Sequence, residues 1–177
     1  LLTGAKVQII PREYFSDPTT LMDYMADSKM TVLTWAVSAM CFVSVMNGFA
    51  YRTPDTVRKV LFSGEVLPIK HYRVWKKYLP QAMFVNLYGP TEVTPKREYE
   101  LTDVIPIGKA FPNETVFLLD ETDQQVTEAG KAGEICVSSS ELALGYYNAP
   151  DKTAQVFVQN PLNHRYDERI YRTGDLA

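Results

Sequence analysis

The sequence predicts an α/β fold in which a parallel β-α-β sheet layer is followed by a strand-rich, mostly antiparallel region. Apolar, β-branched runs alternate with helix-length segments in residues 1–98, which is typical of a parallel sheet. Residues 99–177 contain short apolar runs separated by Gly, Pro, Asn and Asp, which is typical of antiparallel strands. Of the 177 residues 46% are apolar, enough for a core. We therefore expect two subdomains, 1–98 and 99–177.

Helix caps and breakers define the elements of the first subdomain. Asp17 before Pro18 predicts an N-cap followed by proline at the first helical position. Gly48 is expected to end a second, almost wholly apolar helix, and Pro68 to begin a third. We expect the sheet to be covered on both faces. The expected strands are 5–10, 31–35, 57–62 and 82–85, and the expected helices are 18–28, 36–47 and 68–78.

The second subdomain is expected to contain one helix among its strands. Asp151 would lie in the first turn of this helix, where a negative charge is favourable. The expected strands are 105–107, 115–120, 133–138 and 169–173, and the expected helix is 150–157.

Charge, hydropathy and cysteine content exclude several classes of protein. The net charge of −3 gives no positive field, so neither nucleic-acid binding nor attachment to an anionic membrane is expected. The longest apolar stretch, 32–46, is shorter than the ~20 residues that span a bilayer, and it is interpreted as a core element. Cys41 and Cys136 have no partner at metal-binding spacing, which favours a reduced, cytoplasmic setting.

Polar residues follow two of the expected parallel strands. Ligands of open parallel sheets bind beyond the carboxyl ends of the strands, where 63–65 and 86–92 lie. In the second loop Tyr88 offers a stacking face, and Thr91 beside Glu92 offers oxygen donors suited to a triphosphate with its Mg²⁺. The same residues could instead form a polar turn after a strand, and residue chemistry alone leaves both readings open.

Four motifs, in the expected order, resemble those of the acyl-adenylate-forming (AMP-binding) superfamily. They are FSGEVLP at 62–68, NLYGPTE at 86–92, AGEICV with LGYY at 132–147, and YRTGDL at 171–176. The sequence is most similar to the adenylation domains of nonribosomal peptide synthetases and to D-alanine:carrier-protein ligases. The resemblance implies a central fragment of the large N-terminal domain of such an enzyme.

The resemblance also implies an ATP-dependent reaction in two steps. A small carboxylic acid, expected to be an amino acid, attacks the α-phosphate of ATP, and pyrophosphate leaves. The acyl-AMP is then passed to the phosphopantetheine thiol of a carrier protein. The implied cofactors are therefore ATP/AMP and Mg²⁺, with phosphopantetheine on the acceptor.

Nine residues take roles from this resemblance, in nucleotide binding, catalysis and the acyl pocket. Gly64 borders the adenine, Asn86 faces its amine, Tyr88 stacks on its ring, Thr91 holds the α-phosphate, Glu92 binds Mg²⁺, Asp175 accepts from the ribose hydroxyls, and Leu61, Ser63 and Leu87 line the acyl pocket. Thr91 and Glu92 are the catalytic pair. Glu65 and Glu134 are expected to hold loops in place.

The sequence departs from the family pattern in three ways. The phosphate loop and the amine-binding aspartate would lie before Leu1, and the mobile domain with its catalytic lysine would lie after Ala177, so we expect the chain alone to be inactive. The join after 94–97 is shorter than in the family by about ten residues, a strand's worth. The alternatives are an acyl- or aryl-CoA ligase fragment, or a non-catalytic folded fragment that binds nucleotide weakly at best.

Overall fold

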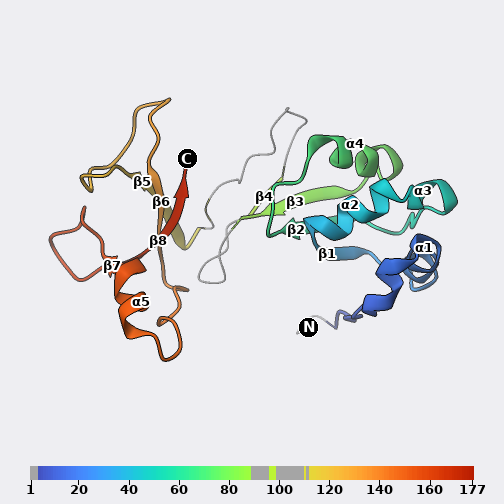
Figure 1. Ribbon diagram of the computed structural model, residues 1–177, viewed down its shortest axis with the longest axis horizontal. Helices are drawn as coiled ribbons and strands as arrows, with labels where there is room; N and C mark the ends of the chain where they lie inside the picture. The colour runs from blue at the N-terminus through green and yellow to red at the C-terminus, as the bar shows by residue number, and fades with distance from the viewer. Residues whose placement is uncertain (1–3, 89–95, 99–109, 111) are drawn as a thin grey trace. The chain divides into compact units, whose positions relative to one another are not determined.

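The chain divides into two compact units, which are described here one at a time. The structure is a computed structural model that describes residues 4–88, 96–98, 110 and 112–177 (Figure 1). Unit 1 comprises Leu1–Asn86 and Glu98–Pro106, and unit 2 comprises Leu87–Arg97 and Ile107–Ala177. Within the described part of the chain, no helix is long and apolar enough to cross a membrane.

A parallel sheet is the framework of the first half of the chain, as predicted. Its strands β1, β2 and β3 run parallel, and the order is β1-β2-β3-β4. In the β1–β2 pair, Thr34 lies opposite Leu61 and Ala36 opposite Ser63. The strands are β1 (Val32–Ala36), β2 (Lys59–Ser63), β3 (Met83–Leu87) and β4 (Lys96–Glu98).

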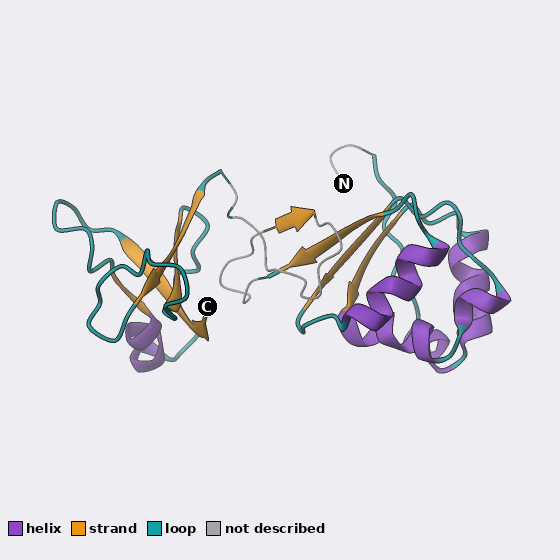
Figure 2. Cartoon of the chain, turned by 90° about the horizontal axis from the view of Figure 1, so that it is seen from above, coloured by secondary structure: helices purple, strands orange, loops and turns teal. Residues whose placement is uncertain are grey.

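The helices of unit 1 lie on one side of this sheet (Figure 2). The expectation that helices cover both faces is therefore wrong for the residues that the structure describes. Strands β1, β2 and β3 follow one another in a single direction, so right-handed crossovers place every connecting helix on the same face. The helices are η1 (Arg12–Ser16), α1 (Pro18–Asp27), α2 (Val37–Val45), α3 (Gly48–Tyr51) and α4 (Ile69–Tyr78).

The core of unit 1 is centred on Trp75 of α4. Its indole Nε1 donates to the carbonyl of Met40 on α2 at 2.9 Å. Its ring makes edge contacts with Trp35 of β1 and Phe49 of α3. On β2 the residues Val60 and Phe62 are buried in this core, and the alternate residues of the strand point to the opposite face.

Two expectations for unit 1 are corrected. Residues 5–10 form no strand: they pair with no other strand among the described residues, and Ile9 is 87% exposed. Asn47, with φ of 55°, ends α2 in place of Gly48, because Asn tolerates this left-handed conformation. Gly48 begins α3 instead, where a Cβ would lie 3.2 Å from Cγ of Met22.

Unit 2 contains an antiparallel sheet with the order β5-β6-β8-β7, as predicted for this region. The expected helix ends one residue early, and the strand β7, which the sequence analysis missed, follows it directly. The expected strand 105–107 lies outside the described residues. The elements are β5 (Glu114–Leu119), β6 (Glu134–Ser139), α5 (Pro150–Val156), β7 (Phe157–Gln159) and β8 (Arg169–Leu176).

Candidate functional site

The T-G-D motif forms a bulge at the end of β8. In the β6–β8 ladder Cys136 pairs with Arg172, whereas Glu134 pairs with Leu176, so residues 173–175 all lie opposite Ile135. Extra residues in one strand bend it and redirect its side chains, and such bulges are common next to active sites. The bulge therefore takes Asp175 out of the regular alternation of the strand.

Hydrogen bonds replace the ladder contacts that the bulge interrupts. The hydroxyl of Thr173 donates to the carbonyl of Ile135 at 2.9 Å and accepts from the backbone N–H of Asp175 at 3.1 Å. The N–H of Gly174 donates to Oε1 of Glu134 at 3.0 Å. Gly174 has φ of 78°, which favours glycine at this position. The conformation of the bulge is thus specified by side chains as well as by backbone.

Tyr88 meets Asp175 within unit 2. The phenol Oη of Tyr88 donates to Oδ2 of Asp175 at 2.5 Å, which joins the second and fourth motifs across 87 positions of sequence. The ring packs on the cluster that contains Val137, Phe157 and Tyr171. Burial, and next the carboxylate of Asp175, raise the pKa of Tyr88 to about 12. The phenol therefore stays protonated at neutral pH and acts as a donor.

In unit 1 the structure places three candidate residues at the carboxyl end of β2. Leu61 and Ser63 are half-buried and lie on the face opposite the core. Gly64 follows them with φ of 93°, and a Cβ there would meet no atom within 4 Å. Gly64 is thus required for its backbone conformation, and a ligand could approach it closely.

Two further candidates lie on β3. Asn86 is only 8% exposed and, at period 2, lies on the same face as Phe84, whose ring contacts Tyr72 of α4. Leu87 is half-buried at the end of the strand. The catalytic pair, Thr91 and Glu92, lies outside the described residues.

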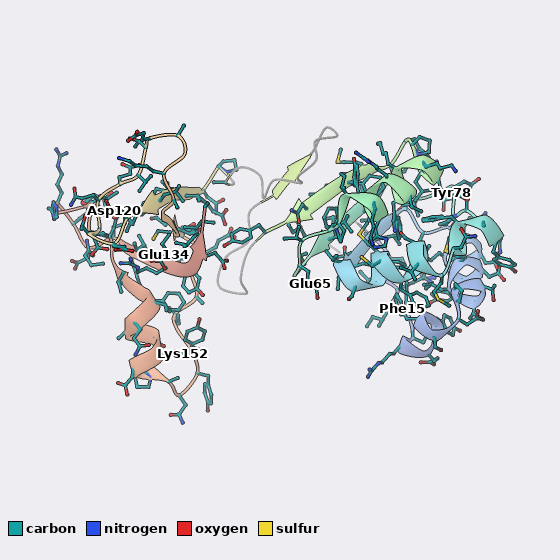
Figure 3. The ribbon with its side chains drawn as sticks, turned by 45° about the horizontal axis from the view of Figure 1, so that its top comes forward. Phe15, Glu65, Tyr78, Asp120, Glu134 and Lys152 are labelled. Atoms are coloured by element: carbon teal, nitrogen blue, oxygen red, sulfur yellow. The ribbon has the colours of Figure 1, made fainter. Side chains whose placement is uncertain are left out.

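An ion pair that the sequence analysis did not identify adjoins the bulge. Nε of Arg172 donates to Oε2 of Glu134 at 2.8 Å, and Nη1 donates to Oδ1 of Asp123 at 2.7 Å. Figure 3 shows Glu134 on the antiparallel sheet. These carboxylates raise the pKa of the Arg172 guanidinium above its ordinary value, so it stays charged. The sequence shows only separate charged residues at 120, 121, 123, 134 and 172, and their spacing does not pair them.

These features define the class of protein, which is an α/β protein with one parallel and one antiparallel sheet. In both sheets, polar residues lie where strands end. The chain belongs to the AMP-binding enzyme family, whose sequence model matches residues 1–147.

The relatives include modular peptide synthases. The chain is 34% identical to surfactin synthase subunit 1 of Bacillus subtilis (strain 168) and 34% identical to tyrocidine synthase 3 of Brevibacillus parabrevis. Each match covers all of this chain, but only 5% and 3% of these two proteins. The matches extend over 184 and 185 positions, more than the 177 residues here, so these relatives contain residues that this chain lacks. The shortening expected after residues 94–97 stays a prediction, because the matches do not locate the difference.

Solved structures share the fold. PA1221, described as a nonribosomal peptide synthetase protein containing adenylation and PCP domains, superimposes with a TM-score of 0.79 at 31% identity over 90% of this chain. IdnL1 superimposes with a TM-score of 0.83 at 30% identity over 95% of it. The chain spans 33% and 36% of these two structures. The chain is thus homologous to part of a nonribosomal peptide synthetase adenylation domain.

Proposed function

We propose that this chain is the central part of a ligase that activates an amino acid with ATP. The carboxylate of the amino acid attacks the α-phosphate, pyrophosphate leaves, and the acyl-AMP passes to the phosphopantetheine thiol of a carrier protein. The observation that carries the proposal is the hydrogen bond between Tyr88 and Asp175. It joins the residue assigned to the adenine and the residue assigned to the ribose.

In this proposal the nucleoside of ATP binds at Tyr88 and Asp175. The exposed carboxylate of Asp175 has acceptor capacity beyond its bond to Tyr88, and the two ribose hydroxyls are matching donors. The ring of Tyr88 supplies a face on which adenine stacks. Gly64 and Asn86 are each proposed to contact the adenine, the first through close backbone approach and the second through its amide.

Thr91 and Glu92 are proposed to hold the α-phosphate and Mg²⁺. Among the described residues, no group of three or more His, Cys, Asp or Glu is placed to hold a metal ion. Mg²⁺ needs only one or two protein carboxylates and keeps several waters, so a single glutamate beside a hydroxyl is a suitable donor set. When bound, the ion supplies positive charge against the phosphates of ATP.

The acyl substrate is proposed to be an amino acid with a small or medium apolar side chain. Leu61, Ser63 and Leu87 offer an apolar wall with one hydroxyl, and such pockets discriminate by only ~1–3 kcal/mol per methylene. The carrier-protein acceptor is supported by PA1221, which combines adenylation and PCP domains. Because the chain spans about a third of the solved relatives, we also propose that it does not catalyse the reaction alone.

The test is amino-acid-dependent exchange of pyrophosphate into ATP, measured on the intact protein that carries this chain. Exchange should be lost on Asp175→Ala and on Glu92→Ala. An unchanged rate in both variants would refute the assignment of the site. Transfer of the acyl group to coenzyme A, with none to a carrier protein, would identify the CoA ligase alternative instead.

A further inference from the structure

A single carboxylate connects the bulge of β8 to the rest of unit 2. Oε1 of Glu134 accepts the N–H of Gly174 at 3.0 Å, which is the donor next to Asp175 in the chain. Oε2 accepts from Nε of Arg172 at 2.8 Å and lies 2.7 Å from its Nη2. Both oxygens of Glu134 are therefore engaged, one by the bulge and one by a cation.

The cation is itself held from its other side. Nη1 of Arg172 lies 2.7 Å from Oδ1 of Asp123, so the guanidinium is fixed between two carboxylates. The side chains of Arg172 and Glu134 are only 26% and 20% exposed, so water screens this pair less than it would a surface pair. Nε and Nη2 of the planar guanidinium both approach Oε2 of Glu134, the first as a hydrogen bond and the second as an ion-pair contact, and this restrains the orientation of the carboxylate.

We propose that Glu134 is a positioning residue for Asp175. Its carboxylate holds the N–H of Gly174, and this contact keeps the bulge in the conformation in which Asp175 meets Tyr88. The role in ATP binding rests on the function proposed above, whereas the effect on the Tyr88–Asp175 contact follows from the geometry of unit 2 alone.

The chemistry of the site requires a carboxylate at position 134. The bulge removes the N–H of Gly174 from the ladder, and Arg172 adds two more donor groups. One oxygen of the side chain must therefore accept from the backbone N–H and the other from the guanidinium. A carboxylate accepts with both oxygens, whereas a glutamine side chain has one accepting oxygen and one donating nitrogen. Glu134→Gln can satisfy Gly174 or Arg172, but not both. Glu134→Ala satisfies neither.

The functional test compares Michaelis constants in pyrophosphate exchange by the intact protein. Glu134→Ala should raise KM for ATP by on the order of ten- to a hundredfold, since a small misplacement of a binding group has effects of this size. Glu134→Gln should raise it less, and KM for the amino acid should change by less than about twofold in both variants. The matched control is Glu128→Gln, which removes a carboxylate that pairs with the exposed Lys131 in the same unit. An unchanged KM for ATP in Glu134→Ala would overturn the proposal, as would equal rises in the two Michaelis constants.

A second measurement needs no nucleotide and uses the milder Glu134→Gln variant. In protein labelled with ¹³C at the tyrosine Cζ, the signal of Tyr88 can be identified among the 11 tyrosines by its loss in Tyr88→Phe. This signal should shift in Glu134→Gln in the same direction as in Asp175→Asn, whereas a signal at the wild-type position would overturn the proposal. If the intact wild-type protein shows no amino-acid-dependent exchange, the proposed function fails, and if Asp175→Ala keeps wild-type exchange, the assignment of Asp175 to the nucleotide site fails. If Asp175→Ala loses exchange while Glu134→Ala keeps the wild-type KM for ATP, only the positioning role fails.

Discussion

Removal of the phenol hydroxyl of Tyr88 isolates the contact on which the site depends. Tyr88→Phe keeps the ring and its packing on the cluster of β6, β7 and β8, and deletes the interactions of the hydroxyl, which are the 2.5 Å hydrogen bond to Asp175 and a contact with the side chain of Thr173. A hydrogen bond to a charged group contributes ~1.5–3 kcal/mol. Because Asp175 is exposed and water can replace the phenol there, we expect the low end of this range, a loss of about 1.5 kcal/mol in the free energy of unfolding.

The assay is urea unfolding at neutral pH, followed by a signal from unit 2. Tyr147→Phe is the matched control, because Tyr147 is fully exposed in the same unit, and its change should stay within about 0.5 kcal/mol. The pKa of Tyr88 is raised from 10.0 to about 12, so its folded-state contribution is present below pH 10 and is lost as pH rises toward 12. The difference in the free energy of unfolding between wild type and Tyr88→Phe should therefore decrease between pH 10 and pH 12. Equal stabilities of Tyr88→Phe and Tyr147→Phe at neutral pH would refute the contact.

Three further perturbations test other parts of the structure. Gly174→Ala should destabilise unit 2 by about 1 kcal/mol and raise KM for ATP in the intact protein. The matched control is Gly130→Ala, which has φ of 88° and equally open space, so it should lose the same stability and leave KM for ATP unchanged. Equal KM values for the two variants would contradict the role of the bulge. Asp17→Ala should lower the melting temperature at pH 7, and Asp17→Asn should lower it less because its amide oxygen still accepts hydrogen bonds. Hydrogen bonds from Thr20 and Thr19 lower the pKa of Asp17 to about 2, so the contribution of its charge is lost as pH falls from about 4 through 2; a deficit of Asp17→Asn relative to wild type that persists unchanged at pH 1.5 would contradict this. Cys136, whose pKa burial raises to about 11, should resist alkylation at pH 8 in the folded protein, and labelling of Cys136 at the rate of an unfolded thiol would show that β6 is not buried as described.

Local signals in the sequence were sufficient for most helices and strands. Asp17 caps α1 as predicted, with Pro18 at its first position. The β-branched and apolar run at 31–35 corresponds to β1, and the change of pattern after residue 98 corresponds to the antiparallel sheet. These features depend on caps, breakers and periodicity, all of which act within a few residues.

Features that depend on distant partners were not predictable in the same way. Residues 5–10 have the composition of a strand but lack a pairing partner among the described residues. Gly48 was interpreted as a helix stop, yet its lack of a side chain serves contact with Met22 of α1, a neighbour that only the folded chain supplies.

The candidate site also combines features that local sequence predicts with features that depend on distant residues. The motifs placed Tyr88 and Asp175 on the list of site residues, but their direct hydrogen bond spans 87 positions and is not encoded in any local pattern. The ion pairs of Arg172 with Glu134 and Asp123 depend on a bulge in register between β6 and β8, which sequence periodicity does not reveal.

The most direct test of the central claim is the crystal structure of the intact protein with AMP. The measurement is the distance from the ribose hydroxyl oxygens to the carboxylate oxygens of Asp175. We expect a hydrogen bond of about 2.5–3.0 Å, with the adenine stacked on the ring of Tyr88. AMP bound elsewhere, with Tyr88 and Asp175 still joined only to each other, would contradict the assignment.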